Sequence, residues 1–96
     1  MKRVLVQEND FDPGRELAAL GGLGSGGVAS FVGHVRGGDG VVAMTLEHYP
    51  AMTGAVLEAL AGEAAARWPL DGVTLIHRVG RLFPGDRIVF VGAASR

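Results

Sequence analysis

Arg36 is the side chain whose position in the sequence most suggests chemistry. It follows the apolar run Val28–Val35 and precedes the glycine-rich stretch Gly37–Gly40. Glycine lets a backbone approach a ligand closely, and the planar guanidinium of arginine matches the oxygens of a phosphate or carboxylate. Two interpretations stay open on this pattern: an ordinary solvated arginine at the end of a strand, or an arginine that binds an anion.

The three histidines do not indicate a metal site. His34, His48 and His77 fall on three different predicted strands, and no H-x-x-x-H or H-E-x-x-H spacing brings two of them onto one helix face. Glu47 and His48 are adjacent, so in a strand their side chains point to opposite faces. We therefore expect packed or hydrogen-bonded histidines, with no metal ion and no resident cofactor.

Two further catalytic patterns are incomplete. Gly22–Gly27 has the letters G-x-G-x-x-G of a dinucleotide-binding turn, but that turn needs a strand before it and a helix after it. Here a short helical pattern precedes it and a strand pattern follows, which indicates a flexible loop. The chain has no cysteine, and Ser25, Ser30 and Ser95 lie in no nucleophile-elbow motif. Covalent catalysis by these residues is not expected.

Size and charge narrow the classes of function. The 96 residues suit one domain, residues 1–96, with a thin core. Nine basic and ten acidic residues leave a net charge of −1, without the basic surplus of a nucleic-acid-binding module. No run approaches the roughly 20 apolar residues that span a bilayer, and the apolar run near Met1 is too short for a signal peptide. A soluble, cytoplasmic protein that binds neither membranes nor nucleic acids is expected.

Short strands and turns must position these side chains. Strand patterns are predicted over residues 3–7, 28–35, 41–48, 73–79 and 87–93. Asp12-Pro13 predicts the N-cap and first position of a short helix that Gly21-Gly22 ends. A glycine turn separates 28–35 from 41–48, so these two strands are predicted to pair as a hairpin.

One long helix is predicted over Pro50–Trp68. Its apolar residues Met52, Val56, Leu60 and Ala64 recur every four positions, joined by Leu57 and Ala61, and are predicted to pack on the sheet. Trp68, Phe83 and Phe90 are predicted to lie in the core. Strands grouped around one packed helix indicate an α+β domain with a mostly antiparallel sheet.

Several separated segments of the chain resemble segments of one protein family, and they follow one another in the same order as in that family. They are Phe31–Arg36, Thr45–Pro50, Ala66–Leu70, Ile76–Gly80 and Arg81–Gly92. Together they resemble the large, catalytic subunit of molybdopterin synthase. The resemblance implies an α/β-hammerhead-like fold and a sulfurtransferase of molybdenum cofactor biosynthesis. It also identifies His34, Val35 and Arg36 with the segment that lines the substrate pocket, although many family members carry lysine where this chain has His34.

The resemblance also implies partners and a reaction. The large subunit forms a homodimer, and each protomer binds a small ubiquitin-like sulfur carrier, which gives a heterotetramer. The carrier's C-terminal thiocarboxylate supplies sulfur to cyclic pyranopterin monophosphate, and cationic groups stabilise the phosphate and the developing charge.

The resemblance places the family's two catalytic lysines and a His-Arg pair beyond Arg96, whereas Lys2 is the only lysine here. No catalytic residue is therefore assigned, the chain is expected to correspond to the N-terminal portion of the large-subunit fold, and on its own it is expected to be inactive. One alternative stays open, namely a non-catalytic, shortened homologue that serves as a dimerisation or carrier-binding module.

Overall fold

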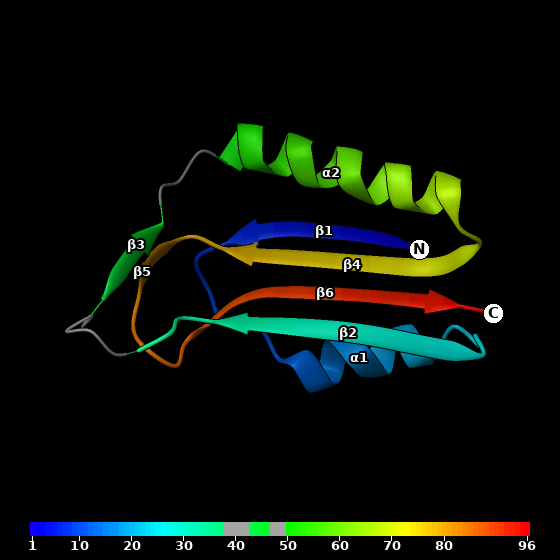
Figure 1. Ribbon diagram of the computed structural model, residues 1–96, viewed down its shortest axis with the longest axis horizontal. Coiled ribbons are helices and arrows are strands. Elements are labelled where there is room, and N and C mark those ends of the chain that lie inside the picture. Colours follow the sequence, from blue (N-terminus) through cyan, green and yellow to red (C-terminus); the bar gives the residue numbers. More distant parts are fainter. Residues whose placement is uncertain (38–42, 47–49) are drawn as a thin grey trace.

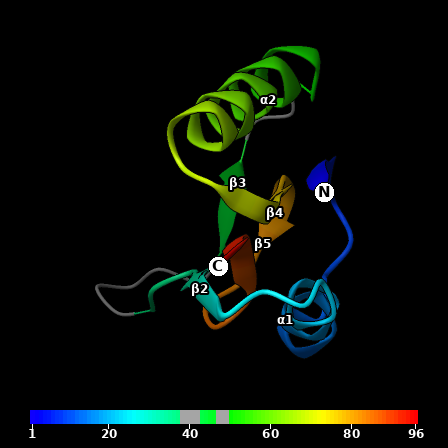
Figure 2. The ribbon, with the colours of Figure 1, turned by 90° about the vertical axis from the view of Figure 1, so that its right-hand side faces the viewer.

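The computed structural model describes residues 1–37, 43–46 and 50–96. Four strands form a sheet in the order β1-β4-β6-β2, and helices α1 and α2 lie on opposite faces of it (Figures 1 and 2). A two-stranded sheet, β3 with β5, stands at one end of the molecule (Figure 1). The elements are β1 (Lys2–Gln7), α1 (Pro13–Gly21), β2 (Gly27–His34), β3 (Met44–Leu46), α2 (Pro50–Arg67), β4 (Leu70–Arg78), β5 (Gly80–Leu82) and β6 (Arg87–Ser95).

The strand pairings confirm the predicted α+β class. β6 runs antiparallel to both β4 and β2, and β3 runs antiparallel to β5, whereas β1 pairs with β4 in parallel. The parallel pair is possible because the 18-residue helix α2 lies between β1 and β4 in the chain and packs across both of them (Figure 1).

Helix α1 begins and ends where the sequence predicts. The Oδ1 atom of Asp12 accepts hydrogen bonds from the backbone N–H groups of Gly14 and Arg15, at 3.0 and 3.3 Å. Pro13 occupies the first helical position, where its missing N–H costs nothing, and Gly22 caps the C-terminus. The helix buries Leu20 completely, and this anchors it to the sheet.

The core under α1 is tightly packed. It joins the buried side chains Phe11, Leu20, Ile76, Phe90 and Ala94. Phe11 and Phe90 meet edge to face, with ring centroids 6.2 Å apart. Gly92 lies beneath these side chains, and a Cβ atom there would stand only 2.5 Å from Leu20 Cδ1 and 2.8 Å from Phe90. Glycine at this position therefore allows α1 to approach β6.

The predicted packing face of α2 is confirmed at Leu57 and Ala61 and wrong at Val56 and Leu60. Ala61, which is 1% exposed, packs with Val73 and Leu75 of β4, and Leu57 packs beside it. Val56 and Leu60 are instead 55% and 52% exposed, and Ala64 is half-buried, while the side chain of Met52 lies outside the described ones. At 3.6 residues per turn, a four-residue spacing drifts by about 40° per step, so an i, i+4 row winds around the helix.

The predicted hairpin was also wrong. β2 pairs with β6 from Gly27 to His34, and β3 pairs with β5, a strand that the sequence did not indicate. Of the predicted strand 41–48, residues 44–46 form β3, and 41, 42, 47 and 48 lie outside the described residues. Adjacency in the sequence favours hairpins, but β6 carries apolar side chains on both faces and therefore occupies the sheet interior between β4 and β2.

Candidate functional site

The residues predicted to line a pocket lie where β2 meets the turn before β6. His34 is the last residue of β2, and a β-bulge between Gly33 and His34 shifts the pairing with β6 at this point. Val35 follows and is 2% exposed. Its N–H donates to Asp86 O at 2.9 Å, and its carbonyl accepts from Gly85 N–H at 2.9 Å. The bulge and these two bonds fix the direction in which Arg36 leaves the sheet.

The turn Phe83–Asp86 is held by its own hydrogen bonds. The Oδ2 atom of Asp86 accepts from Phe83 N–H at 2.8 Å, and Asp86 N–H donates to Phe83 O at 2.9 Å. Gly85 has φ +91°, which favours glycine. Pro84 of this turn lies so near Gly37 that a Cβ atom on Gly37 would stand 3.3 Å from Pro84 Cβ. The turn therefore supports the backbone on which Arg36 is carried.

His34 and Arg36 are both exposed and flank the buried Val35. Within the ranges that the structure describes, the Arg36 guanidinium makes neither a hydrogen bond nor an ion pair. The arrangement presents a cation and a titratable imidazole on a rigid support, next to a glycine backbone. Such a surface can bind an anionic ligand through charge-assisted hydrogen bonds.

A network of charged residues nearby was not predicted from the sequence. Arg87 donates to both carboxylate oxygens of Asp10, from Nε at 3.1 Å and from Nη2 at 2.8 Å. Arg78 Nη1 lies 3.7 Å from Asp10 Oδ1 and donates to Arg87 O at 3.0 Å. Hydrogen bonding by Arg87 is the main cause that lowers the pKa of Asp10. Since Asp10 and Arg87 are 77 positions apart, no local pattern could have revealed the pair.

Arg78 fastens the loop after β1 to the sheet. Its Nε and Nη2 atoms donate to Glu8 O at 3.1 and 3.0 Å, and its side chain is only 13% exposed. Two backbone segments, one before α1 and one at the start of β6, are thus joined by one guanidinium. This role is structural, because the guanidinium N–H groups of Arg78 donate to backbone carbonyls of Glu8 and Arg87.

Two of the three aromatic side chains predicted to be core residues are exposed. Phe90 is fully buried, but Trp68 is 56% and Phe83 50% exposed. Arg81 lies over the Phe83 ring at 5.6 Å from its centroid, a cation–π contact. Phe83 and Arg81 therefore extend the exposed surface around the turn that supports Arg36.

The two histidines that the structure describes lie on different strands. His34 ends β2, His77 lies on β4, and His48 is outside the described residues. The Nδ1 atom of His77 is buried and has no partner among the described residues. In the same part of the chain, no group of three or more His, Cys, Asp or Glu side chains could hold a metal ion. No helix of the described ranges is long and apolar enough to cross a membrane.

The fold and the matched sequence together define the class of protein. The family model of the MoaE protein matches residues 6–96. The chain therefore belongs to the MoaE protein family.

Individual relatives agree with this assignment. The chain is 52% identical over 97 residues to the molybdopterin synthase catalytic subunit of Pseudomonas aeruginosa, covering 96% of this chain and 65% of the relative. The protein of the same name from Salmonella typhimurium is 48% identical over 97 residues, with 97% and 65% covered. The solved structure of the molybdopterin biosynthesis MoaE protein from Burkholderia ambifaria has a TM-score of 0.88 and 48% identity over 99% of this chain and 65% of that one. The chain thus spans about two thirds of the length of these relatives.

Proposed function

We propose that this chain acts as the large subunit of molybdopterin synthase, a cytoplasmic sulfurtransferase. In this role it transfers sulfur from a thiocarboxylated small carrier subunit to cyclic pyranopterin monophosphate, on the path to molybdenum cofactor. The observation that carries the proposal is the MoaE family match over residues 6–96, with 52% identity to a protein named molybdopterin synthase catalytic subunit.

Arg36 is proposed to bind the phosphate of the precursor. Its guanidinium is exposed, has no partner among the described residues and stands on a backbone fixed by the bonds between Val35 and the turn 83–86. A fixed backbone reduces the entropy that is lost when the ligand binds. His34 is exposed beside it and adds a positive charge only when its imidazole is protonated.

The chemistry requires cationic groups around the reacting sulfur and the phosphate. The thiocarboxylate sulfur of the carrier acts as the nucleophile, and positive side chains stabilise the charge that develops as it attacks the precursor. By the family resemblance, lysines perform much of this work, and Lys2 does not correspond to them. We therefore propose that residues 1–96 by themselves bind the precursor without turning it over, and that sulfur transfer needs the whole large-subunit fold, of which they match 65% in the Pseudomonas aeruginosa relative.

The small carrier and a second copy of the chain are the proposed partners. An apolar part of the sheet surface, beside α2, supports the proposed contact with a second copy of the chain. Across the sheet, Leu75, Val91 and Phe31 are neighbours in register, and their exposure rises from 9% to 38% to 61% towards the β2 edge. Covering this row would remove apolar surface from water and stabilise a dimer.

The Arg36→Ala variant tests the proposed site. Removing one charge-assisted contact, which contributes about 1.5–3 kcal/mol, should weaken binding of cyclic pyranopterin monophosphate about tenfold or more in a calorimetric titration. Arg67→Ala is the matched control, because Arg67 is an exposed arginine of α2 that contacts Glu63. If the Arg36→Ala variant and the unchanged chain bind cyclic pyranopterin monophosphate with equal affinity, Arg36 is an ordinary solvated arginine.

A further inference from the structure

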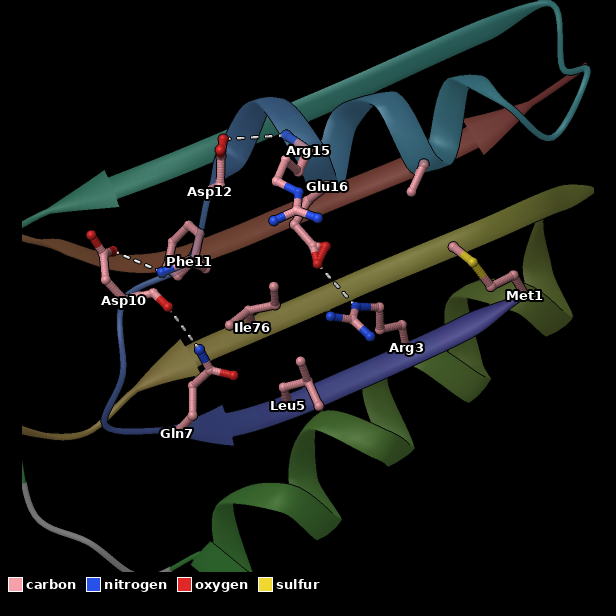
Figure 3. A pocket seen from close by; sticks show the side chains of 11 residues that line it. Met1, Arg3, Leu5, Gln7, Asp10, Phe11, Asp12, Arg15, Glu16 and Ile76 are labelled. Carbon is pink, nitrogen blue, oxygen red and sulfur yellow. Dashed lines mark hydrogen bonds and ion pairs between the residues drawn. The ribbon is translucent and has the colours of Figure 1, made fainter.

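A groove separates β1 from α1 on the face of the sheet that α1 covers, and none of His34, Val35 and Arg36 lines it. Its volume is about 570 Å³, within the range of about 300–1,000 Å³ that small-molecule sites occupy. Figure 3 shows β1 as one wall, α1 with the residues before it as the other, and Ile76 of β4 between them.

All three carboxylates of the groove already have partners. Asp10 accepts two hydrogen bonds from Arg87, and Asp12 accepts from two backbone N–H groups in the first turn of α1. Glu16 accepts from Arg3 Nε at 3.0 Å. Each of the three carboxylates thus already accepts hydrogen bonds from protein groups, and those of Asp10 and Glu16 are also paired with arginines.

The two arginines of the groove, in contrast, have guanidinium N–H groups without a partner among the described residues. Arg3 uses its Nε atom on Glu16, and across residues 1–37, 43–46 and 50–96 no contact engages its two terminal nitrogens. The Arg15 side chain has no hydrogen bond or ion pair in the same ranges. Figure 3 shows the two guanidinium groups projecting into the space between α1 and β1 from opposite walls.

Apolar side chains border the same space. Met1 is 51% exposed, Ala19 is exposed and Leu5 is half-buried, so each has apolar surface that a ligand could cover. Met1 has an unbranched side chain that adapts to different shapes. The groove therefore combines unused cationic donors with accessible apolar walls.

We propose that this groove is a binding site for a small anion with an apolar body, such as an aromatic phosphate monoester or carboxylate. The terminal nitrogens of Arg3 and Arg15 hold the anionic oxygens, because guanidinium groups match these oxygens in geometry and charge. The apolar body contacts Met1, Leu5 and Ala19. The site is separate from the proposed precursor site at Arg36 and does not depend on it.

A titration of the ¹⁵N-labelled chain, followed by the shifts of its backbone N–H signals, tests the proposal. The probes are phenyl phosphate and phenylacetate, with inorganic phosphate and neutral benzyl alcohol for comparison. Both aromatic anions are expected to produce saturable shifts at Leu5, Phe11, Arg15 and Ala19. Inorganic phosphate lacks the apolar body and benzyl alcohol lacks the charge, so each should bind the groove at least about tenfold more weakly.

Replacement of one arginine provides the decisive comparison. Arg15→Gln keeps a long polar side chain and should weaken phenyl phosphate binding about tenfold. Arg67→Gln, on the opposite helix, should leave it unchanged, and circular dichroism shows whether both variants are folded. Equal affinity of Arg15→Gln and the unchanged chain would overturn the proposal. Shifts confined to residues 34–37 and 83–87 would overturn it too, because the anion would then occupy the turn beside Arg36.

Discussion

Asp10 and Arg87 join segments that are 77 positions apart, and together with the bonds from Arg78 to Glu8 O this pair holds the loop before α1 on the sheet. Asp10 also accepts a hydrogen bond from Phe11 N–H at 2.8 Å, so its carboxylate positions the ring that packs on Phe90. The pair is half exposed, with 52% of the Asp10 side chain and 37% of the Arg87 side chain accessible. Solvent screening therefore limits what it contributes to stability.

Asp10→Asn should lower the free energy of unfolding modestly, by about 0.5–1 kcal/mol at neutral pH after allowance for screening. The hydrogen bonds from Arg87 lower the pKa of Asp10 in the folded chain. Its contribution is thus fully present above the pKa of the unfolded state, near 4, and is lost as pH falls through the lower folded-state pKa. Urea unfolding across this range should show the difference between the two proteins shrinking below about pH 4. A difference that stays constant down to pH 2 would contradict this assignment.

The sequence revealed part of the residue-scale picture. The position of Arg36 between an apolar strand and glycines left two interpretations open, and the resemblance to the large subunit selected it as a site residue. The structure places Arg36 on a fixed backbone. The partners of Arg78 and Arg87 could not be predicted, because only the folded sheet brings Glu8 and Asp10 beside them. The role of Arg36 as a phosphate ligand stays a prediction until binding is measured.

Among the elements, α1 was predictable because its limits depend on local chemistry. Asp12, Pro13 and Gly22 satisfy or omit the helix-end hydrogen bonds whatever the rest of the chain does. The packing face of α2 was not predictable in the same way. Alanine, glycine and leucine occur all around this helix, so the apolar pattern does not identify one face, and contact with β1 and β4 decides.

Paired substitutions on α2 distinguish the two possible faces. Leu57→Ala should lower the free energy of unfolding by about 2 kcal/mol, because Leu57 packs against the buried core beneath α2. Leu60→Ala, three positions on and with the same change in helix propensity, should cost less than about 1 kcal/mol because Leu60 is 52% exposed. Chemical denaturation of both variants gives the comparison. A larger loss for Leu60→Ala would restore the four-residue stripe as the packing face.

At the scale of the whole molecule, the row of Leu75, Val91 and Phe31, which is exposed at Val91 and Phe31, predicts self-association. Sedimentation at micromolar concentration should show a dimer, and Phe31→Ser should shift the equilibrium towards monomer, because Phe31 is the most exposed side chain of the row. Leu17→Ser removes an exposed apolar side chain from α1 on the other face and should have little effect. A chain that sediments only as a monomer at micromolar concentration would contradict this prediction.

The overall α+β class followed from the sequence, whereas the strand neighbours did not. Strand runs and one long helix can be recognised locally. The pairing of β2 with β6 joins segments about 60 positions apart, and no local pattern specifies it. The resemblance to the large subunit, which the family match confirms, rested on separated blocks such as Phe31–Arg36 rather than on general physical rules.

Sulfur transfer by a chimera tests the proposed function most directly. Residues 1–96 would replace the matching region of the Pseudomonas aeruginosa relative, of which they cover 65%. With a thiocarboxylated carrier and cyclic pyranopterin monophosphate, the chimera should form molybdopterin. The same chimera with Arg36→Ala should form it about tenfold or more slowly at limiting precursor. A folded chimera that binds the carrier and yields no molybdopterin would contradict the account.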